Sequence, residues 1–177
     1  MSSNALSRIG RVWKFGDDIN TDLIQPSAAF RLAQTEQHTL VFSGVRPGWI
    51  REVSEGDIMI AGRNFGVGSG RPIGALLRAC GIVGLVAESL NGLGLRNCIN
   101  FALPAMECRG ITSLFQEGQT ASVDFCSGKV ENIDTRQCLY GKPLPPLFQE
   151  VVVAGGIVQM LIRGGFIEPT PTNSSAS

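Results

Sequence analysis

A strand, a glycine-rich loop and a helix follow one another directly in the middle of the chain, and this succession constrains the fold most. Ile58–Ala61 is a short apolar run, and the loop Gly62–Gly70 that follows it is rich in glycine. The next segment, Arg71–Ala79, leads into a continuous apolar run at Ile82–Ala87 and has a helical stripe made of Ile73, Leu76, Leu77 and Cys80. Strand, helix and strand in this order predict an α/β fold with parallel strands and right-handed crossovers.

Weaker patterns extend this unit in both directions. Gly10–Phe15 predicts a strand, and Ser89 is a candidate N-cap for a second helix that ends near Asn97. Further patterns predict a third strand, a β-hairpin and a helix that continues through two glycines, at Leu103–Met106, Thr120–Cys126 with Lys129–Ile133, and Pro145–Ile162.

The chain has 177 residues, the length of about one ordinary domain. We expect a flexible leader at 1–9, a single domain at 10–167 and a disordered tail at 168–177, because the tail is rich in Pro, Thr and Ser. Inside the domain, Gln34–Gly44 is the most polar stretch, and we expect it to be exposed.

Charge excludes several classes of function. Lys plus Arg is 15 and Asp plus Glu is 15, so the formal net charge is zero. A nucleic-acid binder needs a basic field to displace counterions, and binding to anionic lipid needs a polybasic surface. No apolar run approaches the roughly 18–20 residues of a membrane span, and the start lacks the pattern of a secretory signal. We therefore expect a cytoplasmic protein that binds neither nucleic acid nor membrane.

The metal-ligating residue types are sparse and scattered. The five cysteines occur at wide gaps without a CxxC pair, and His38 is the only histidine. We therefore predict no metal site in this chain, and we interpret the cysteines as small buried hydrophobic residues and His38 as part of a solvated loop.

The glycine-rich loop is the strongest candidate site for chemistry. Glycines allow successive N–H groups to form an anion nest, and the predicted helix N-terminus that follows also favours an anion. Ser69 lies in the loop, and Arg71 can hold a carboxylate or phosphate with two hydrogen bonds. A P-loop would need a Lys after the glycines, and a dinucleotide fingerprint would need a third glycine where Arg71 stands. An acidic small molecule is the expected ligand, and a tight strand-to-helix turn with no ligand is the alternative.

A second candidate is the polar segment Asn20–Pro26. Asp22 in this segment could orient an arginine or a serine, or act on a proton. As a bare pattern, Thr21 and Asp22 are equally typical of capping groups in a polar turn.

Three segments carry a resemblance to a known family. They read GRVWKFGDDINTDLIQP at Gly10–Pro26, GDIMIAGRNFGVGSGR at Gly56–Arg71 and GIVGLVAESLNGLGLRNCINFALP at Gly81–Pro104. In this order they resemble the small subunit of isopropylmalate isomerase (3-isopropylmalate dehydratase), the swivelling domain of the aconitase superfamily. The resemblance implies a single β/β/α-layered domain of the aconitase C-terminal type.

The family also implies a division of labour between two subunits of a hydro-lyase in leucine biosynthesis. A large partner subunit is expected to carry a [4Fe–4S] cluster held by three cysteines, so this chain itself is expected to bind no cofactor. The small subunit is expected to close over the cluster and to be active only in that complex. The reaction implied is dehydration and rehydration of a small hydroxy di- or tricarboxylate.

Residue by residue, the resemblance assigns roles within the two candidate segments. Ser69 matches the serine that removes the proton, and Asp22 with Thr21 matches the Thr-Asp pair of the active site. Arg71 matches the arginine that grips a substrate carboxylate, with Gly68 and Gly70 beside it in the binding loop.

Three positions depart from the family pattern. Gly70 stands where relatives have a second serine, Pro72 follows Arg71, and Ala28 stands where relatives often have arginine. These departures leave two alternatives open: the same chemistry on another malate derivative such as methyl- or dimethylmalate, or a non-catalytic regulatory or binding subunit. Phe30–Gly44 lies where the family's specificity loop falls.

Overall fold

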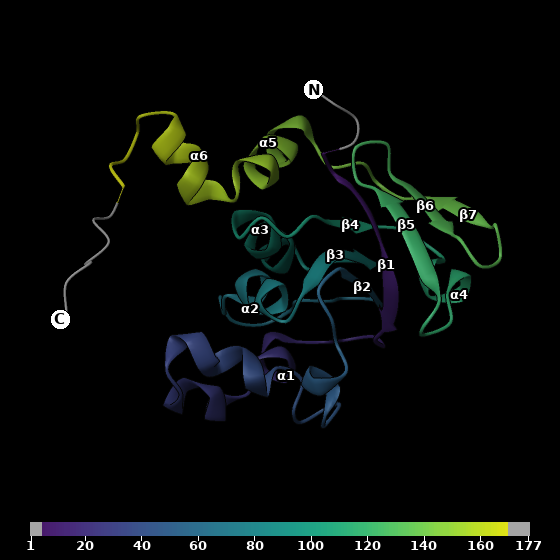
Figure 1. Cartoon of the computed structure of the whole chain (residues 1–177), viewed down its shortest axis with the longest axis horizontal. Coiled ribbons are helices and arrows are strands. Elements are labelled where there is room, and N and C mark those ends of the chain that lie inside the picture. The colour runs from purple at the N-terminus through teal and green to yellow at the C-terminus, as the bar shows by residue number, and fades with distance from the viewer. Residues whose placement is uncertain (1–4, 170–177) are drawn as a thin grey trace.

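The computed structural model describes residues 5–169. Within these residues a seven-stranded sheet has the order β4-β3-β2-β1-β5-β6-β7 (Figure 1). The first four strands in this order are parallel and the others continue antiparallel from β1. Their bounds are β1 Ser7–Lys14, β2 Asp57–Ala61, β3 Ile82–Ala87, β4 Ala105–Glu107, β5 Thr120–Asp124, β6 Lys129–Asn132 and β7 Cys138–Tyr140. The predicted α/β fold with parallel strands is confirmed, as is the predicted hairpin, which is β5–β6.

Helices and 3-10 turns connect and cover these strands. The α-helices are α1 Thr21–Ile24, α2 Ile73–Ala79, α3 Gly92–Asn100, α4 Ile111–Leu114, α5 Pro146–Ala154 and α6 Ile157–Arg163. The 3-10 turns are η1 Ser27–Arg31, η2 Gln34–Leu40 and η3 Trp49–Arg51.

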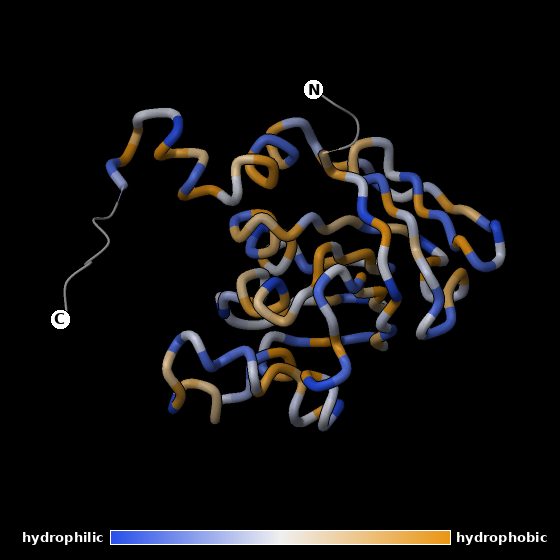
Figure 2. The backbone as a smooth tube through the Cα atoms, in the orientation of Figure 1, coloured by the Kyte–Doolittle hydropathy of each residue, from blue (hydrophilic) through white to orange (hydrophobic). Residues whose placement is uncertain are grey.

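The two faces of the parallel half pack against different layers. All five residues of β2 are buried, and strand side chains alternate between faces. Met59 and Ala61 belong to one core, which α2 and α3 cover, whereas Ile58 and Ile60 belong to a second core that includes Val123 of β5. The antiparallel half therefore curls back over one face of the parallel half while helices cover the other (Figure 1), and the predicted β/β/α layering is confirmed. In the tube view the hydrophobic segments gather between these layers (Figure 2).

The helices of the central unit begin later than the sequence predicts. α2 begins at Ile73 rather than Arg71, because Pro72 has φ −78° and ψ +56° and lies outside the helix. Its predicted stripe is buried against the core. The prediction of Ser89 as the N-cap of α3 is wrong: Asn91 caps the helix by accepting from the Leu93 N–H at 3.0 Å. The Ser89 hydroxyl is occupied elsewhere, since it accepts from the Asn64 N–H at 2.9 Å.

The amino end of the chain contributes more than the predicted leader allows. β1 begins at Ser7, and Leu6 is 2% exposed within the second core. The leader boundary at residue 9 is therefore wrong, because Ser7, Arg8 and Ile9 already pair with β5. Most of the predicted tail, residues 170–177, lies outside the described residues.

The carboxyl-terminal region forms two helices where the sequence predicts one. α5 and α6 meet at an angle of 85°, and Gly155 and Gly156 between them have φ of +94° and +111°. An α-helix cannot continue through these backbone conformations. In residues 5–169 no single helix is long and apolar enough to span a membrane; only α5 and α6 taken together, across their bend, reach that length and composition.

The polar stretch Gln34–Gly44 is only partly exposed, as its last third enters the core. Phe42 is fully buried and stacks on Phe15 with ring centroids 4.3 Å apart, while Trp49 meets it edge-on at 5.1 Å. The aromatic cluster fixes this segment beneath the carboxyl edge of the sheet.

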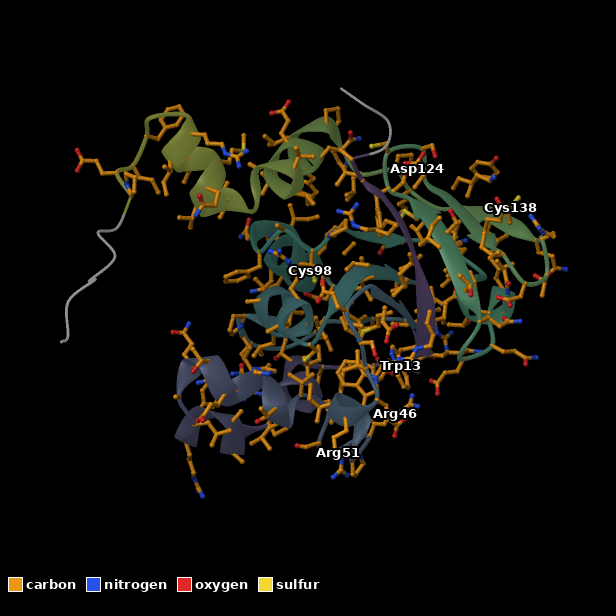
Figure 3. The ribbon with its side chains drawn as sticks, in the orientation of Figure 1. Trp13, Arg46, Arg51, Cys98, Asp124 and Cys138 are labelled. Atoms are coloured by element: carbon orange, nitrogen blue, oxygen red, sulfur yellow. The ribbon has the colours of Figure 1, made fainter. Side chains whose placement is uncertain are left out.

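A buried carboxylate joins β1 to the start of β2. Asp57 accepts from Trp13 Nε1 at 2.7 Å and pairs with Arg11 at 2.7 Å. Burial alone would raise the pKa of Asp57, but hydrogen bonds from Arg11, Ser54 and Trp13 outweigh it and lower the pKa below its ordinary value. Arg46, labelled beside Trp13 in Figure 3, lies 4.6 Å from the centroid of that ring.

Candidate active site

The glycine-rich loop and the Thr-Asp segment meet at the carboxyl edge of the parallel strands. The loop follows β2, and the segment that ends in α1 follows β1. The Thr21 N–H donates to the Val67 carbonyl at 2.9 Å, and the Gly66 N–H donates to the Ile19 carbonyl at 2.8 Å. Open α/β sheets bind ligands at this edge. The structure thus brings the two sequence-predicted segments together.

Ser69 lies at the outer surface of this junction. Its side chain is exposed, and its Oγ lies 3.4 Å from Thr21 Oγ1. Thr21 itself is 2% exposed, so its hydroxyl is a fixed partner for a serine that is open to solvent. The contact is long for a hydroxyl pair and leaves the Ser69 hydroxyl available to a ligand.

Gly68 allows the loop to lie this close to Thr21. A Cβ at position 68 would lie 2.6 Å from Thr21 Oγ1, and the residue has φ of +123°. Both the close approach and the backbone conformation require glycine. Gly68 therefore shapes the site by having no side chain.

Arg71 is anchored to the chain through one nitrogen. Its Nη1 donates to the Gln25 carbonyl at 2.6 Å and the Thr21 carbonyl at 3.2 Å, and also forms an ion pair with Asp22 Oδ1. The ring of Phe30 lies 5.3 Å from its Cζ. Among residues 5–169, Nε and Nη2 have no hydrogen-bond partner, so the outer side of the guanidinium can still hold a carboxylate with two hydrogen bonds.

This geometry selects among the roles that the sequence left open for Asp22. The Asp22 side chain is 69% exposed and contacts Arg71, whereas Ser69 contacts Thr21. Of orienting an arginine, orienting a serine or acting on a proton, the geometry favours orienting the arginine.

The expectation that the start of α2 offers free N–H groups to an anion is wrong for Pro72, Ile73 and Gly74. Pro72 has no N–H, the Ile73 N–H donates to the Arg71 carbonyl, and the Gly74 N–H donates to Asn97 Oδ1. The unused donors lie earlier: within the described chain, the amides of Gly68, Ser69 and Gly70 have no hydrogen-bond partner. The exposed loop therefore presents three of its own donors.

Behind the loop, two backbones touch without intervening side chains. A Cβ on Gly94 in α3 would lie 2.8 Å from the Gly66 carbonyl oxygen, and a Cβ on Gly66 would lie 3.0 Å from Gly94 Cα. Gly94, at the amino end of α3, therefore lets the helix backbone pack directly against the loop backbone at Gly66.

In the described part of the chain, the crevice at this junction is too small to enclose a ligand. The crevice beneath Ser69 and Arg71, which Leu93 and Asn97 also line, has no room for a water-sized sphere. A larger cleft of about 450 Å³ lies farther along the same edge, and its lining includes Glu88, Glu107 and Lys142. Any acid that Ser69 and Arg71 bind must therefore lie on the open surface of the loop.

The cysteines divide into two groups. Cys80, Cys98 and Cys108 are buried as predicted, and burial raises the pKa of the Cys80 and Cys98 thiols to about 12. The interpretation is wrong for Cys138, which is exposed on the edge strand β7, away from Cys98 in the helical layer (Figure 3), and for the partly exposed Cys126. In the described part of the chain, no three His, Cys, Asp or Glu side chains gather into a group that could hold a metal ion.

Two further polar residues support the site, although the sequence assigned a site role to neither. Gln25 is fully buried, and its backbone carbonyl accepts from Arg71, while its Nε2 donates to Gln37 Oε1 at 2.7 Å. Asn97 holds the first turn of α2. Gln25 lies in the polar segment Asn20–Pro26 and Asn97 in a polar segment at a helix end, and neither residue type identifies the contact that the structure shows.

The layered sheet, with Thr-Asp and Gly-Ser-Gly-Arg segments meeting at its carboxyl edge, matches a class of proteins, the small subunits of dehydratases. The chain is 39% identical over 158 residues to 3-isopropylmalate dehydratase small subunit 1 of Methanopyrus kandleri, which covers 88% of this chain and 93% of that protein. It is 38% identical over 156 residues to the isopropylmalate/citramalate isomerase small subunit of Methanocaldococcus jannaschii, covering 86% and 92%. The chain belongs to the family of 3-isopropylmalate dehydratase small subunits.

The solved structures agree with this assignment. The crystal structure of 3-isopropylmalate dehydratase (leuD) from Methanocaldococcus jannaschii matches with a TM-score of 0.83 at 27% identity, covering 90% of this chain and 95% of that one. No family model matches the chain.

Proposed function

We propose that this chain forms one half of a hydro-lyase active site, in which it grips the substrate carboxylate and moves the proton. The observation that carries the proposal is the junction of Ser69, Thr21 and Arg71, where Ser69 is exposed and the crevice beneath it has no room for a water-sized sphere. Dehydration of a hydroxy acid needs a site from which bulk water is excluded. A large partner subunit, implied by the family, would supply the opposing surface.

Arg71 would hold the substrate carboxylate through Nε and Nη2, with Asp22 and two carbonyls fixing its plane. Ser69, as alkoxide, would take the proton from the carbon next to the leaving hydroxyl and return it on rehydration. A serine alkoxide needs stabilisation, which the free amides of Gly68, Ser69 and Gly70 are placed to offer. Arg71 is less suited to that task, because its Nη1 donates to the Thr21 and Gln25 carbonyls.

In this arrangement the [4Fe–4S] cluster would lie in the large subunit. The described residues of this chain do not provide a set of ligands for it. When bound in the partner, such a cluster supplies a Lewis acid for the substrate hydroxyl.

Isopropylmalate is the first candidate substrate. A relative is named as an isopropylmalate/citramalate isomerase small subunit, which favours citramalate, a methyl-substituted malate, as the second. Gly70 bears on this choice because it removes a hydroxyl from the loop without filling the space, as nothing lies within 4 Å of the place for its Cβ.

Anaerobic reconstitution tests the division of labour. The purified chain is treated with iron and sulfide, alone and together with a cluster-bearing large subunit, and turnover of isopropylmalate and citramalate is measured. The expected result is no cluster absorbance and no turnover for the chain alone, and turnover in the complex. A stable cluster on this chain alone would contradict the division of labour, and an assembled but inactive complex would favour the non-catalytic alternative.

A further inference from the structure

Two arginines lie close together at the edge of the sheet opposite the candidate active site. Arg8 is in the first half of β1, and Arg78 is in the last turn of α2. They line a hollow of about 140 Å³, whose lining also includes Glu55, Ile82 and Leu103. This volume is several times the roughly 30 Å³ that one water molecule occupies in the liquid.

The strand register creates this hollow. β1 pairs with β2 only from Val12 onward, so Arg8 lies beyond the point where β2 begins. Its side chain reaches toward β3, where a Cβ on Gly84 would lie 3.9 Å from Arg8 Cγ. The Phe125 ring fills the place of a Gly84 side chain, since a Cβ there would lie 2.9 Å from Phe125 Cζ. The late start of β2 therefore leaves the space next to Arg8 open.

Both guanidinium groups are held in place by backbone carbonyls through one nitrogen each. Arg8 Nη1 donates to the carbonyls of Ala5 and Ser7 at 3.0 and 2.9 Å, and Arg78 Nη1 donates to the Phe101 carbonyl at 2.9 Å. Within residues 5–169, Nε and Nη2 of both side chains have no hydrogen-bond partner. Each guanidinium group is thus fixed through its Nη1, and its Nε and Nη2 remain available as donors to a ligand.

Among the described residues, no carboxylate forms an ion pair with either guanidinium group. Glu55 lines the hollow, but no carboxylate among residues 5–169 lies within 4.0 Å of Arg8 or Arg78. The residues outside that range contain no Asp or Glu. Burial, and secondly the charge of Arg78, lower the pKa of Arg8, the direction expected when a cation lacks a counter-charge.

We infer that the hollow between Arg8 and Arg78 is a binding site for a small oxyanion, a phosphate or carboxylate group, at the amino edge of the parallel sheet. An oxyanion there would accept from the unused donors of both forks and would neutralise two adjacent positive charges. The length of β2, about 16 Å at the usual rise per residue, separates this edge from the glycine-rich loop. The site is therefore distinct from the proposed active site and does not depend on the proposed function.

Side-chain NMR of the whole chain tests the inference directly. The arginine Nε–H signals are followed while inorganic phosphate, or in a parallel series sodium acetate, replaces chloride at constant ionic strength. The expected result is a saturable shift of the Arg8 and Arg78 signals, while the exposed Arg136 stays constant. A shift with phosphate alone assigns a phosphate group, and a shift with acetate as well assigns carboxylates too.

Two variants make the test specific. Arg78→Gln changes an exposed residue and should weaken phosphate binding at least about tenfold without unfolding the chain, because one of two charged forks is lost. Arg109→Gln, in the cleft on the opposite edge, is the matched control and should leave binding unchanged. The inference is overturned if neither anion gives a saturable shift, or if Arg109→Gln weakens binding as much as Arg78→Gln does.

Discussion

Two loops leave the same edge of the parallel sheet, one after β2 and one after β3, and they use their polar groups in opposite ways. In the loop after β3, the Glu88 carboxylate accepts from the Gly110 N–H, the Thr112 N–H and the Thr112 hydroxyl at 2.7, 2.9 and 2.7 Å. Ser89 accepts from Asn64, and Asn91 caps α3. The loop after β2 leaves Ser69 exposed and the amides of Gly68, Ser69 and Gly70 unused.

The loop after β3 therefore stabilises the fold, whereas the loop after β2 has groups available to a ligand. A buried or half-buried polar group without a partner costs free energy, so a loop that serves only the fold satisfies its groups internally. Substitutions of the paired groups after β3 should therefore change stability, and substitutions at Ser69, Gly70 and Arg71 should change turnover in the complex.

The largest difference is expected between the two serines. Ser69→Ala should lower kcat of the assembled complex about 10²- to 10⁴-fold, because it removes the proposed proton-transfer group, while Tm changes little. Ser89→Ala should do the reverse: kcat is kept, and the free energy of unfolding falls by about 1–2 kcal/mol because the Asn64 N–H loses its acceptor. Steady-state kinetics and urea unfolding of both variants check this. Normal turnover by Ser69→Ala would remove Ser69 from the mechanism.

A similar loss of activity is expected for substitution of Arg71, directly after the glycine-rich loop. Arg71→Lys keeps the charge but loses the paired geometry, so kcat/KM should fall roughly 30- to several thousand-fold, if about 2–5 kcal/mol of binding is lost at about 1.4 kcal/mol per decade. Arg63→Lys is the control, because Arg63 lies at the same edge but is exposed and paired with Asp17. Equal activity of Arg71→Lys and wild type would favour the tight-turn interpretation of the loop.

A smaller effect is expected from Glu88 in the loop after β3, whose contribution to the free energy of unfolding should depend on pH. Burial alone would raise the pKa of Glu88, but hydrogen bonds from Thr112 and Gly110 outweigh it and lower the pKa below the ordinary 4.5. The stabilisation by Glu88 is therefore fully present above pH 4.5 and is lost as the pH falls through the lower folded-state pKa. Glu88→Gln should cost about 1–2 kcal/mol at neutral pH and less in acid. Urea unfolding across this range, with the exposed Glu36→Gln as control, measures the difference; a cost that is independent of pH would contradict the assignment.

The smallest effect is expected where the loop after β2 departs from its relatives. Gly70→Ser adds a hydroxyl in open space, so Tm should not change. One added neutral hydrogen bond, worth about 0.5–1.5 kcal/mol, should raise kcat/KM for isopropylmalate relative to citramalate about two- to tenfold. Competition between the two acids in the assembled complex measures this ratio, and an unchanged ratio would show that the missing hydroxyl does not set specificity.

The parallel half of the fold was predictable because its signals are local and strong. Ile58–Ala61 and Ile82–Ala87 are short apolar runs, and the stripe in α2 has helical spacing. The failures concern what only tertiary contacts decide. Ser89 has the chemistry of an N-cap, but its hydroxyl accepts from the Asn64 N–H instead. Ser7, Arg8 and Ile9 belong to a strand because β5 offers a partner.

The candidate site was predictable as a set of residues but not as a set of contacts. The glycine-rich loop and the Thr-Asp segment could be found from residue types and from the family resemblance. Neither could show that Arg71 is held by the Gln25 carbonyl, or that Asn97 and the Arg71 carbonyl satisfy the start of α2. Backbone carbonyls carry no signature in the sequence, so contacts to them are visible only in the fold.

The contact between Gly66 and Gly94 has a mechanical consequence. Side chains between two elements usually absorb small displacements by changing rotamer, but here backbone meets backbone and nothing lies between to yield. The loop after β2 and the first turn of α3 must therefore shift together, as one rigid piece. A partner or ligand that presses on Ser69 would transmit that displacement to α3 and, through its packing, to α5.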